Sequence, residues 1–229
     1  MNFNIFKPQQ QRFSVALLAS IAAHVLLAVF IVATDDNKPL PKKDRPINQK
    51  WSWDRILRSP YIKQADVLQG IYFFEDKFDD KTIANHFNFY EPLTVHESSL
   101  SPCVHSIIAS KIGMQQKAYE MYLRTSRLDL DDYNHEVHEG LHITSMAGTW
   151  LSIVQGFGGM RNFNNTLAFN PQIPKEWQSY SFKINYRGVT LKVFKSQNIC
   201  TFTNESDTPV EILVAGKKVV VNSEVLVEL

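Results

Sequence analysis

Three hydrophobic patterns follow one another along the chain. Residues 13–33 form a run of about 21 residues without a formal charge, which at about 1.5 Å per residue is long enough to cross a bilayer core of about 30 Å. From about Ser59 to Met160 the apolar residues recur with helical spacing, and from Tyr180 they alternate with a period of two. The pattern predicts a membrane segment, a helical region and a β region, in that order.

Serine–proline pairs and a glycine mark the expected helix ends. Ser59-Pro60 and Ser101-Pro102 each place a capping hydroxyl before a proline at the first helical position, and Gly113 stands where the second helix should stop. Two further helices are expected over residues 117–128 and 144–155.

The period of two predicts hairpins. Alternating apolar residues over 182–186 and 191–193 flank Arg187-Gly188, which has the composition of a tight turn. Residues 210–214 and 218–221, joined through 215–217, predict a second hairpin. We therefore expect a small C-terminal antiparallel β-sheet domain.

The charge-free run is expected to be a transmembrane helix or an uncleaved signal anchor, with a cleaved signal peptide as the alternative. Within it Ser20 and His24 stand four residues apart, so a helix places both on one face. In lipid such polar groups cost free energy unless a partner helix satisfies them. The Ser-x-x-x-His spacing resembles the anchors of the TonB and TolA family, while two tolerated polar residues are the alternative.

Composition narrows the function classes. The formal net charge is +1, from 24 Lys and Arg against 23 Asp and Glu, and no basic cluster stands out, which argues against a nucleic-acid partner. Cys103 and Cys200 lie far apart on different predicted elements, so we expect buried thiols and no disulfide framework.

The segment from Gly140 to Gly148 is the strongest candidate for chemistry. It places His142, Thr144 and Ser145 where a helical pattern begins, and free backbone N–H groups at a helix start attract anions. These side chains could therefore surround a phosphate. Ordinary helix capping by Ser and Thr is the alternative.

Two further polar clusters invite a binding function. Lys63 and Gln64, expected in the first turn of an apolar helix, offer the donors and acceptors that sugar hydroxyls need. His96, Glu97 and Ser98 stand in a loop that enters a helix, with Glu97 a conceivable general acid or base.

Three histidines, His135, His138 and His142, have spacings that a metal site could use. Gly140 interrupts the helix such a site would need, and the order H-E-V-H is one residue short of H-E-x-x-H. We expect a polar loop and no metal. Aromatic residues near helix starts, such as Trp150, are expected to fill core.

Four segments in one order resemble the C-terminal part of maltose phosphorylases and their relatives in glycoside hydrolase family 65. They are RPINQKWSWDRILRSPYIKQADVLQGIYFFEDKF, FYEPLTVHESSLSPCVHS, AYEMYLRTSRLDLDDYN and GLHITSMAGTWLSIVQGFGGMR. The resemblance runs from about Arg45 to the chain end and covers about the last quarter of such an enzyme.

The resemblance implies a domain organisation. Residues 1–34 would be the membrane anchor and 35–44 a linker. Residues 45–165 would be the last helices of an (α/α)₆ barrel catalytic domain, and 166–229 a C-terminal β-sheet domain.

It also implies site residues. Lys63 and Gln64 would contact the glucosyl unit, and His96, Glu97 and Ser98 would support the pocket rim. The last group, which would bind phosphate, comprises His142, Thr144, Ser145 and Gly148.

The implied reaction is inverting phosphorolysis of an α-glucosyl disaccharide such as maltose, with trehalose and kojibiose as alternatives. Inorganic phosphate is the co-substrate, no cofactor is implied, and full-length family members are expected to be homodimers in the cytoplasm. The family's general acid is a Glu upstream of these segments, in a region with no counterpart here, so no catalytic residue is assigned. We expect a fragment that is inactive alone; a membrane-anchored TonB-like or sugar-binding interaction protein is the alternative.

Overall fold

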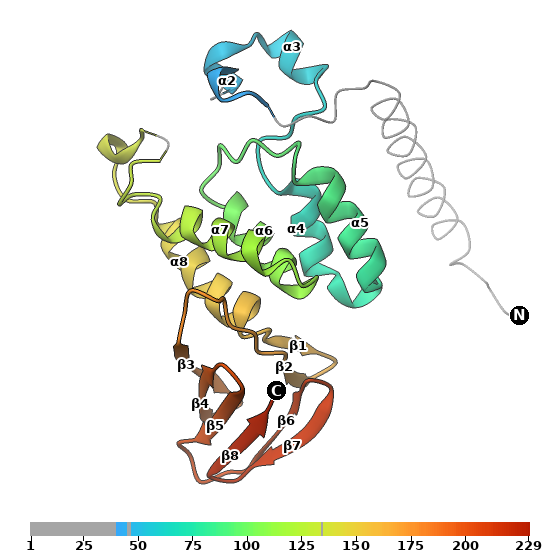
Figure 1. Ribbon diagram of the computed structural model, residues 1–229, viewed down its shortest axis with the longest axis vertical. Coiled ribbons are helices and arrows are strands. Elements are labelled where there is room, and N and C mark those ends of the chain that lie inside the picture. Colours follow the sequence, from blue (N-terminus) through green and yellow to red (C-terminus); the bar gives the residue numbers. More distant parts are fainter. Residues whose placement is uncertain (1–39, 45–46, 134) are drawn as a thin grey trace, which may run out of the picture. The chain divides into compact units, whose positions relative to one another are not determined.

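The computed structural model describes residues 40–44, 47–133 and 135–229 (Figure 1). The chain divides into two compact units, Met1–Tyr61 and Ile62–Leu229. The predicted membrane segment 13–33, with Ser20 and His24, lies outside the described residues. Across the ranges that are described, every helix is too short or too polar to span a membrane.

The first unit contains short elements: η1 Lys42–Asp44, α2 Ile47–Lys50 and α3 Trp53–Leu57. Ser52 caps α3 by accepting the N–H of Arg55 at 3.4 Å. Ser59 lies beyond the end of α3 and donates its hydroxyl to the carbonyl of Ile56 at 2.8 Å. The prediction that Ser59-Pro60 starts a helix is therefore wrong.

The second unit begins with a group of helices. Their bounds are α4 Asp66–Phe73, η2 Glu75–Lys77, α5 Asp80–Tyr90, α6 Ser101–Lys111, α7 Gln115–Ser126, η3 Val137–Glu139, α8 Ile143–Leu151 and the π-helix η4 Ser152–Phe157. Helix α6 packs against α4, α5, α7 and α8, and it lies between α4 and α8 in Figure 1. Residues Ser101–Ser110 are all buried. Helix α6 is therefore the centre of the helical part.

The helix starts differ from those predicted. Helix α4 begins only at Asp66 because Ile62 is held in extended backbone: it forms a parallel bridge with Thr94, and its N–H bonds to the carbonyl of Leu93 at 3.0 Å. Ser101 is itself the first residue of α6, with Leu100 at the cap. The predicted stop at Gly113 is confirmed, since α6 ends at Lys111 and Gly113 has a φ of 79°.

The β part consists of two four-stranded sheets, ordered β1-β2-β6-β7 and β3-β4-β5-β8. The strands are β1 Arg161–Phe163, β2 Thr166–Phe169, β3 Ser179–Tyr186, β4 Val189–Ser196, β5 Ile199–Asn204, β6 Val210–Val214, β7 Lys217–Val221 and β8 Glu224–Glu228. Apolar side chains from both sheets, such as Leu167, Ile212, Leu191 and Phe202, form one core. The sheets therefore pack as a sandwich.

Both predicted hairpins are present. Tyr186 pairs with Val189 across Arg187-Gly188, whose φ values of 52° and 82° suit a tight turn. β6 and β7 are joined by Ala215-Gly216. The expected C-terminal antiparallel β-sheet domain is present as two sheets, with one exception to the antiparallel pairing, because β2 pairs with β6 in parallel. The first strand begins at Arg161, ahead of the predicted boundary at 166.

The two cysteines are free and buried, as predicted. Cys103 lies in the core of the helical part and Cys200 in the core of the sandwich. Burial raises the pKa of the Cys103 thiol to about 11 and that of Cys200 to about 12. Both thiols therefore stay protonated and unreactive at neutral pH.

Candidate functional site

Lys63 and Gln64 lie in the loop that precedes α4, and not in its first turn as predicted. Lys63 is exposed, and the amide nitrogen of Gln64 donates to the Asp66 carboxylate at 2.8 Å. The extended backbone at Ile62 therefore presents the Lys-Gln pair beside the N-terminus of α4.

The loop 93–100 joins the predicted clusters. In its middle the N–H of Glu97 donates to the carbonyl of Lys63 at 3.1 Å. Further along, the hydroxyl of Ser99 lies 2.7 Å from that of Thr144, and the hydroxyl of Ser145 donates to the carbonyl of Ser99 at 3.2 Å. The loop therefore holds the Lys63 and Thr144–Ser145 segments beside each other, although they are far apart in sequence.

Buried imidazoles fix the shape of this loop. His96 has a φ of 56°, and its Nδ1 lies 2.8 Å from the hydroxyl of Ser101. Arg124 donates to the carbonyl of His96 at 3.0 Å. The ring of His105 stands edge-on to that of His96, with centroids 4.4 Å apart. Backbone and side chains thus hold a left-handed residue that sterics alone disfavour.

His105 is a site-supporting residue that the sequence did not reveal. Its Nδ1 lies 3.0 Å from the carbonyl of Ser101, so this nitrogen carries the proton. Burial lowers the pKa of His105 to about 4, and the positive charges of Arg124 and Lys117 add to that lowering. The ring is therefore neutral at physiological pH.

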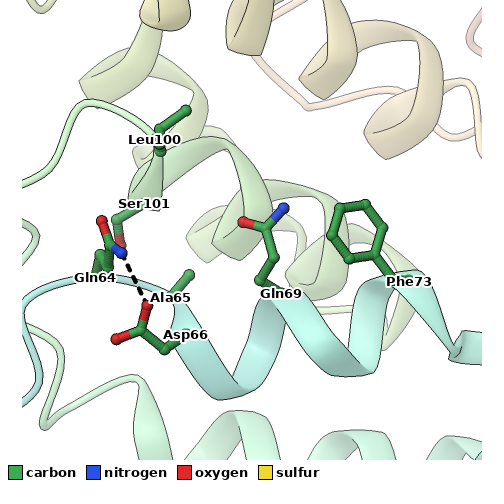
Figure 2. Close-up of a pocket in the computed structure, with 7 residues that line it drawn as sticks. All are labelled: Gln64, Ala65, Asp66, Gln69, Phe73, Leu100 and Ser101. Atoms are coloured by element: carbon green, nitrogen blue, oxygen red, sulfur yellow. Dashed lines mark hydrogen bonds between the residues drawn. The ribbon is translucent and has the colours of Figure 1, made fainter.

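A cavity of about 310 Å³ opens between the starts of α4 and α6. Its lining comprises Gln64, Ala65, Asp66, Gln69, Phe73, Leu100 and Ser101. Figure 2 shows the amide of Gln64 turned toward Asp66, with Gln69 and Phe73 projecting from one side of α4. Amide and carboxylate groups beside an aromatic ring are a combination that suits a sugar.

Helix α8 starts at Ile143 with His142 at its cap position. The Asp129 carboxylate accepts both the backbone N–H of His142, at 2.9 Å, and its Nδ1, at 2.6 Å. These bonds hold the pKa of the Asp129 carboxyl below its ordinary value. The other ring nitrogen, Nε2, lies 3.6 Å from the carboxylate of Glu136. An acidic pair therefore flanks the ring for which phosphate binding was predicted.

The other predicted phosphate residues occupy different surroundings. Thr144 is exposed, while Ser145 and Gly148 are buried. A Cβ at Gly148 would lie 2.9 Å from the Cβ of Cys103 and 3.1 Å from the Cγ2 of Thr125. Packing of α8 on its neighbours accounts for this glycine, so its part in phosphate binding stays a prediction.

Ser98 shapes its own loop, and two of the three histidines considered for a metal site are exposed. The Ser98 hydroxyl accepts the N–H of Leu100 at 3.4 Å and so shapes the loop locally. The side chains of His135 and His138 are 90% and 74% exposed, whereas that of His142 faces Asp129. Within the described ranges, no three metal-ligating side chains are grouped to hold an ion.

Asp129 and Ser99 were also missed. Both lie within segments that carry the family resemblance, but neither was given a role there: each is identified by the residue that it meets across the fold, His142 for Asp129 and Thr144 for Ser99. Ser99 belongs to the polar run that starts at His96, which was the available signal.

A second cavity, of about 630 Å³, lies where the helices meet the sandwich. Its charged groups pair with one another: Arg161 binds the Glu75 carboxylate through Nε at 3.1 and 2.9 Å, and Lys111 lies 3.3 Å from Glu75. This cluster is a structural ion-pair network.

The sequence matches two known domains. Residues 27–151 match the glycosyl hydrolase family 65 central catalytic domain, and residues 160–221 match the family's C-terminal domain. The first match begins at residue 27, ahead of Arg45, the residue from which we expected the resemblance to run.

Individual proteins similar to this chain support the same family assignment. The chain is 54% identical over 181 residues to a maltose phosphorylase of Bacillus subtilis (79% of this chain, 24% of the relative). It is 41% identical over 180 residues to an alpha,alpha-trehalose phosphorylase of Thermoanaerobacter brockii (79% and 23%). A solved structure from the human microbiome, named as a kojibiose phosphorylase, superposes with a TM-score of 0.79 at 40% identity (83% and 28%). The chain thus spans about a quarter of the length of these relatives.

Proposed function

This chain belongs to glycosyl hydrolase family 65, and from that premise we propose that it forms the sugar- and phosphate-binding wall of an inverting disaccharide phosphorylase. Lys63 and Gln64 hold the glucosyl unit. His142, Thr144 and Ser145 hold inorganic phosphate at the start of α8, and the loop around His96, Glu97 and Ser98 supports both.

The reaction proposed is phosphorolysis. A general acid, supplied by a part of the family fold outside the segments matched here, protonates the glycosidic oxygen. A phosphate oxygen attacks the anomeric carbon from the opposite face as the bond to the leaving sugar breaks. Maltose and phosphate give glucose and β-glucose 1-phosphate.

One observation carries the proposal: loop 93–100 bonds to Lys63 on one side and to Thr144 and Ser145 on the other. Phosphorolysis needs a sugar and a phosphate within bonding distance of each other. The loop supports such a pairing of two otherwise separate segments.

Maltose is the proposed substrate because the relative at 54% identity is a maltose phosphorylase, whereas the trehalose phosphorylases are 41% and 42% identical and the kojibiose phosphorylases 32–40%. Residues of the sugar pocket that lie outside the matched segments would also contribute to the selection of the disaccharide.

The Glu136 carboxylate competes with phosphate for the imidazole of His142. With Nδ1 committed to Asp129, His142 has only Nε2 for phosphate, and Nε2 faces the Glu136 carboxylate at 3.6 Å. Phosphate therefore has to displace an anion, so its binding to this chain alone is expected to be weak, with a Kd of about 1 mM or higher.

Titrations followed by amide chemical shifts test the proposal. Phosphate should shift signals at residues 142–145, and β-glucose 1-phosphate should shift these together with residues 63–66. Ser145→Ala should weaken phosphate binding, and Glu136→Gln should strengthen it by removing the competing charge.

Ser181→Ala, an exposed position on β3, is the matched control and should change nothing. Shifts confined to His96 and its neighbours, or equal phosphate affinity in all three variants, would refute the assignment.

A further inference from the structure

The second cavity, where the helices meet the sandwich, has the size and the place of a ligand site. Its volume of about 630 Å³ lies within the range of about 300–1,000 Å³ that is typical of small-molecule sites, and such sites occur preferentially where two parts of a fold meet. Among the described residues that line it, none was assigned above to sugar or phosphate. The cavity is therefore separate from the site of the proposed function.

One wall of this cavity belongs to the π-helix η4. The N–H of Gly158 bonds to the carbonyl of Ile153, five residues earlier, at 2.7 Å. Such wide turns are rare and are frequent at functional sites. Gln155 of this helix lines the cavity, and its carbonyl accepts Nη1 of Arg161 at 2.6 Å. The departure from α-helical geometry thus falls at the cavity wall.

Two glutamine amides on the wall have their oxygens engaged by other side chains. The Oε1 of Gln155 accepts the hydroxyl of Tyr72, and the Oε1 of Gln172 accepts the amide of Gln115. Each glutamine is left with its NH₂ group, a pair of donors, for a ligand. Asn170, which directly follows β2, is exposed and adds a third amide to the lining.

The charged groups on the wall compensate one another. Lys111 Nζ lies 3.3 Å from the carboxylate of Glu75 and 3.1 Å from that of Asp80, and Nη2 of Arg161 lies 2.9 Å from Glu75. Two cations and two anions give no net charge that would select a charged ligand. Amide donors beside carboxylate acceptors instead match hydroxyl groups, which both accept and donate.

We propose that the second cavity is an accessory site for a neutral sugar of one or two units. Gln155, Gln172 and Asn170 donate to its hydroxyl oxygens, and the carboxylates of Glu75 and Asp80 accept its hydroxyl protons. The inference does not rest on the proposed function, because it concerns a different cavity and a different set of residues.

Side-chain amide signals test the inference. The ¹⁵N-labelled full chain is titrated separately with glucose, maltose and inorganic phosphate. We expect either sugar to shift the NH₂ signals of Gln155, Gln172 and Asn170, and phosphate to leave them unchanged.

Two variants should weaken sugar binding here. Asn170→Asp removes one donor and adds a carboxylate, so the dissociation constant should rise about threefold to tenfold. Ala168→Leu should raise it at least as much, because Ala168 lines the cavity from the face of β2 opposite to the buried Leu167 and Phe169, and a larger side chain there takes up ligand space.

Asn198→Asp is the matched control. It makes the same substitution at an exposed position in the turn between β4 and β5, in the other sheet, and should leave sugar binding unchanged. Circular dichroism melts of all three variants establish that each is folded.

The outcomes separate this inference from the proposed function. Unchanged signals of the three amides overturn the inference, whatever happens at residues 63–66, and shifts at the three amides without shifts at residues 63–66 uphold it against the proposed function. Phosphate that shifts the three amides, or equal sugar affinity in all variants, also overturns it. Trp150 is 47% exposed and so does not fill the core, contrary to expectation; a sugar that shifts only its indole signal binds there and overturns the inference as well.

Discussion

At the residue scale, His105 links protonation to the stability of the candidate site. It is fully buried beneath the His96 loop, and burial lowers its pKa from an ordinary 6.5 to about 4. Between these values the unfolded chain binds a proton that the folded chain does not. The contribution of the neutral ring is therefore complete above pH 6.5 and is lost as the pH falls toward 4.

We predict that the free energy of unfolding of the helical part falls by up to about 1.4 kcal/mol per pH unit in this window because of His105. His105→Asn, which keeps a donor for the Ser101 carbonyl, should flatten that slope. Urea unfolding followed by helical circular dichroism from pH 7 to 4.5 measures it. His138→Asn, at a side chain that is 74% exposed, should keep the original slope; equal slopes in all three proteins would contradict the prediction.

At the element scale, the absence of a side chain at Gly148 sets how closely α8 approaches its neighbours. An added Cβ would meet the Cβ of Cys103 on α6 at 2.9 Å and the Cγ2 of Thr125 on α7 at 3.1 Å. Both atoms sit close to their helix backbones, so the helices themselves have to move.

We predict that Gly148→Ala lowers the free energy of unfolding by about 1–3 kcal/mol through overpacking. The comparison is Gly70→Ala, inside α4, where no atom lies within 4 Å of the added Cβ. That change should stabilise the helix by about 0.4–1 kcal/mol, because alanine restricts the unfolded chain. Chemical unfolding of both variants decides the matter, and destabilisation of the same size in both would count against the packing argument.

At the scale of the whole molecule, an ion-pair cluster ties the helices to the sandwich. Glu75 of η2 is 7% exposed and binds Arg161 of β1 through both carboxylate oxygens, with Lys111 of α6 at 3.3 Å. Removing the carboxylate would leave two cations with reduced compensation in a partly buried place.

We predict that Glu75→Gln lowers the free energy of unfolding by about 3–5 kcal/mol and separates the melting of the helices from that of the sandwich. Glu211→Gln is the comparison, because it breaks an exposed ion pair: the side chain of Glu211 is 55% exposed and that of its partner Lys218 is 74% exposed. This change should lower the free energy of unfolding by less than about 1 kcal/mol. Far-ultraviolet and near-ultraviolet melts report the two effects. Similar losses in both variants, with one joint transition, would show that the cluster does not couple the parts.

Local chemistry in the sequence was enough for several elements. Alternation around Arg187-Gly188 and around Ala215-Gly216 predicted both hairpins, because the side-chain period and the turn lie within one short stretch. Gly113 predicted the end of α6 for the same reason, since its positive φ serves a local need. Four motifs in one order were enough for the family.

Tertiary structure decided the features that depend on contacts between residues far apart in the sequence. The bridge between Ile62 and Thr94 keeps Lys63 and Gln64 out of α4. The parallel pairing of β2 with β6 joins β1, β2, β6 and β7 into one sheet, and Asp129 holds His142. No periodicity encodes these contacts, because each joins residues from separate elements and forms only when packing brings them together. The sequence thus determined the hairpins, the end of α6 and the family, whereas tertiary contacts decided where α4 begins and how the polar clusters meet.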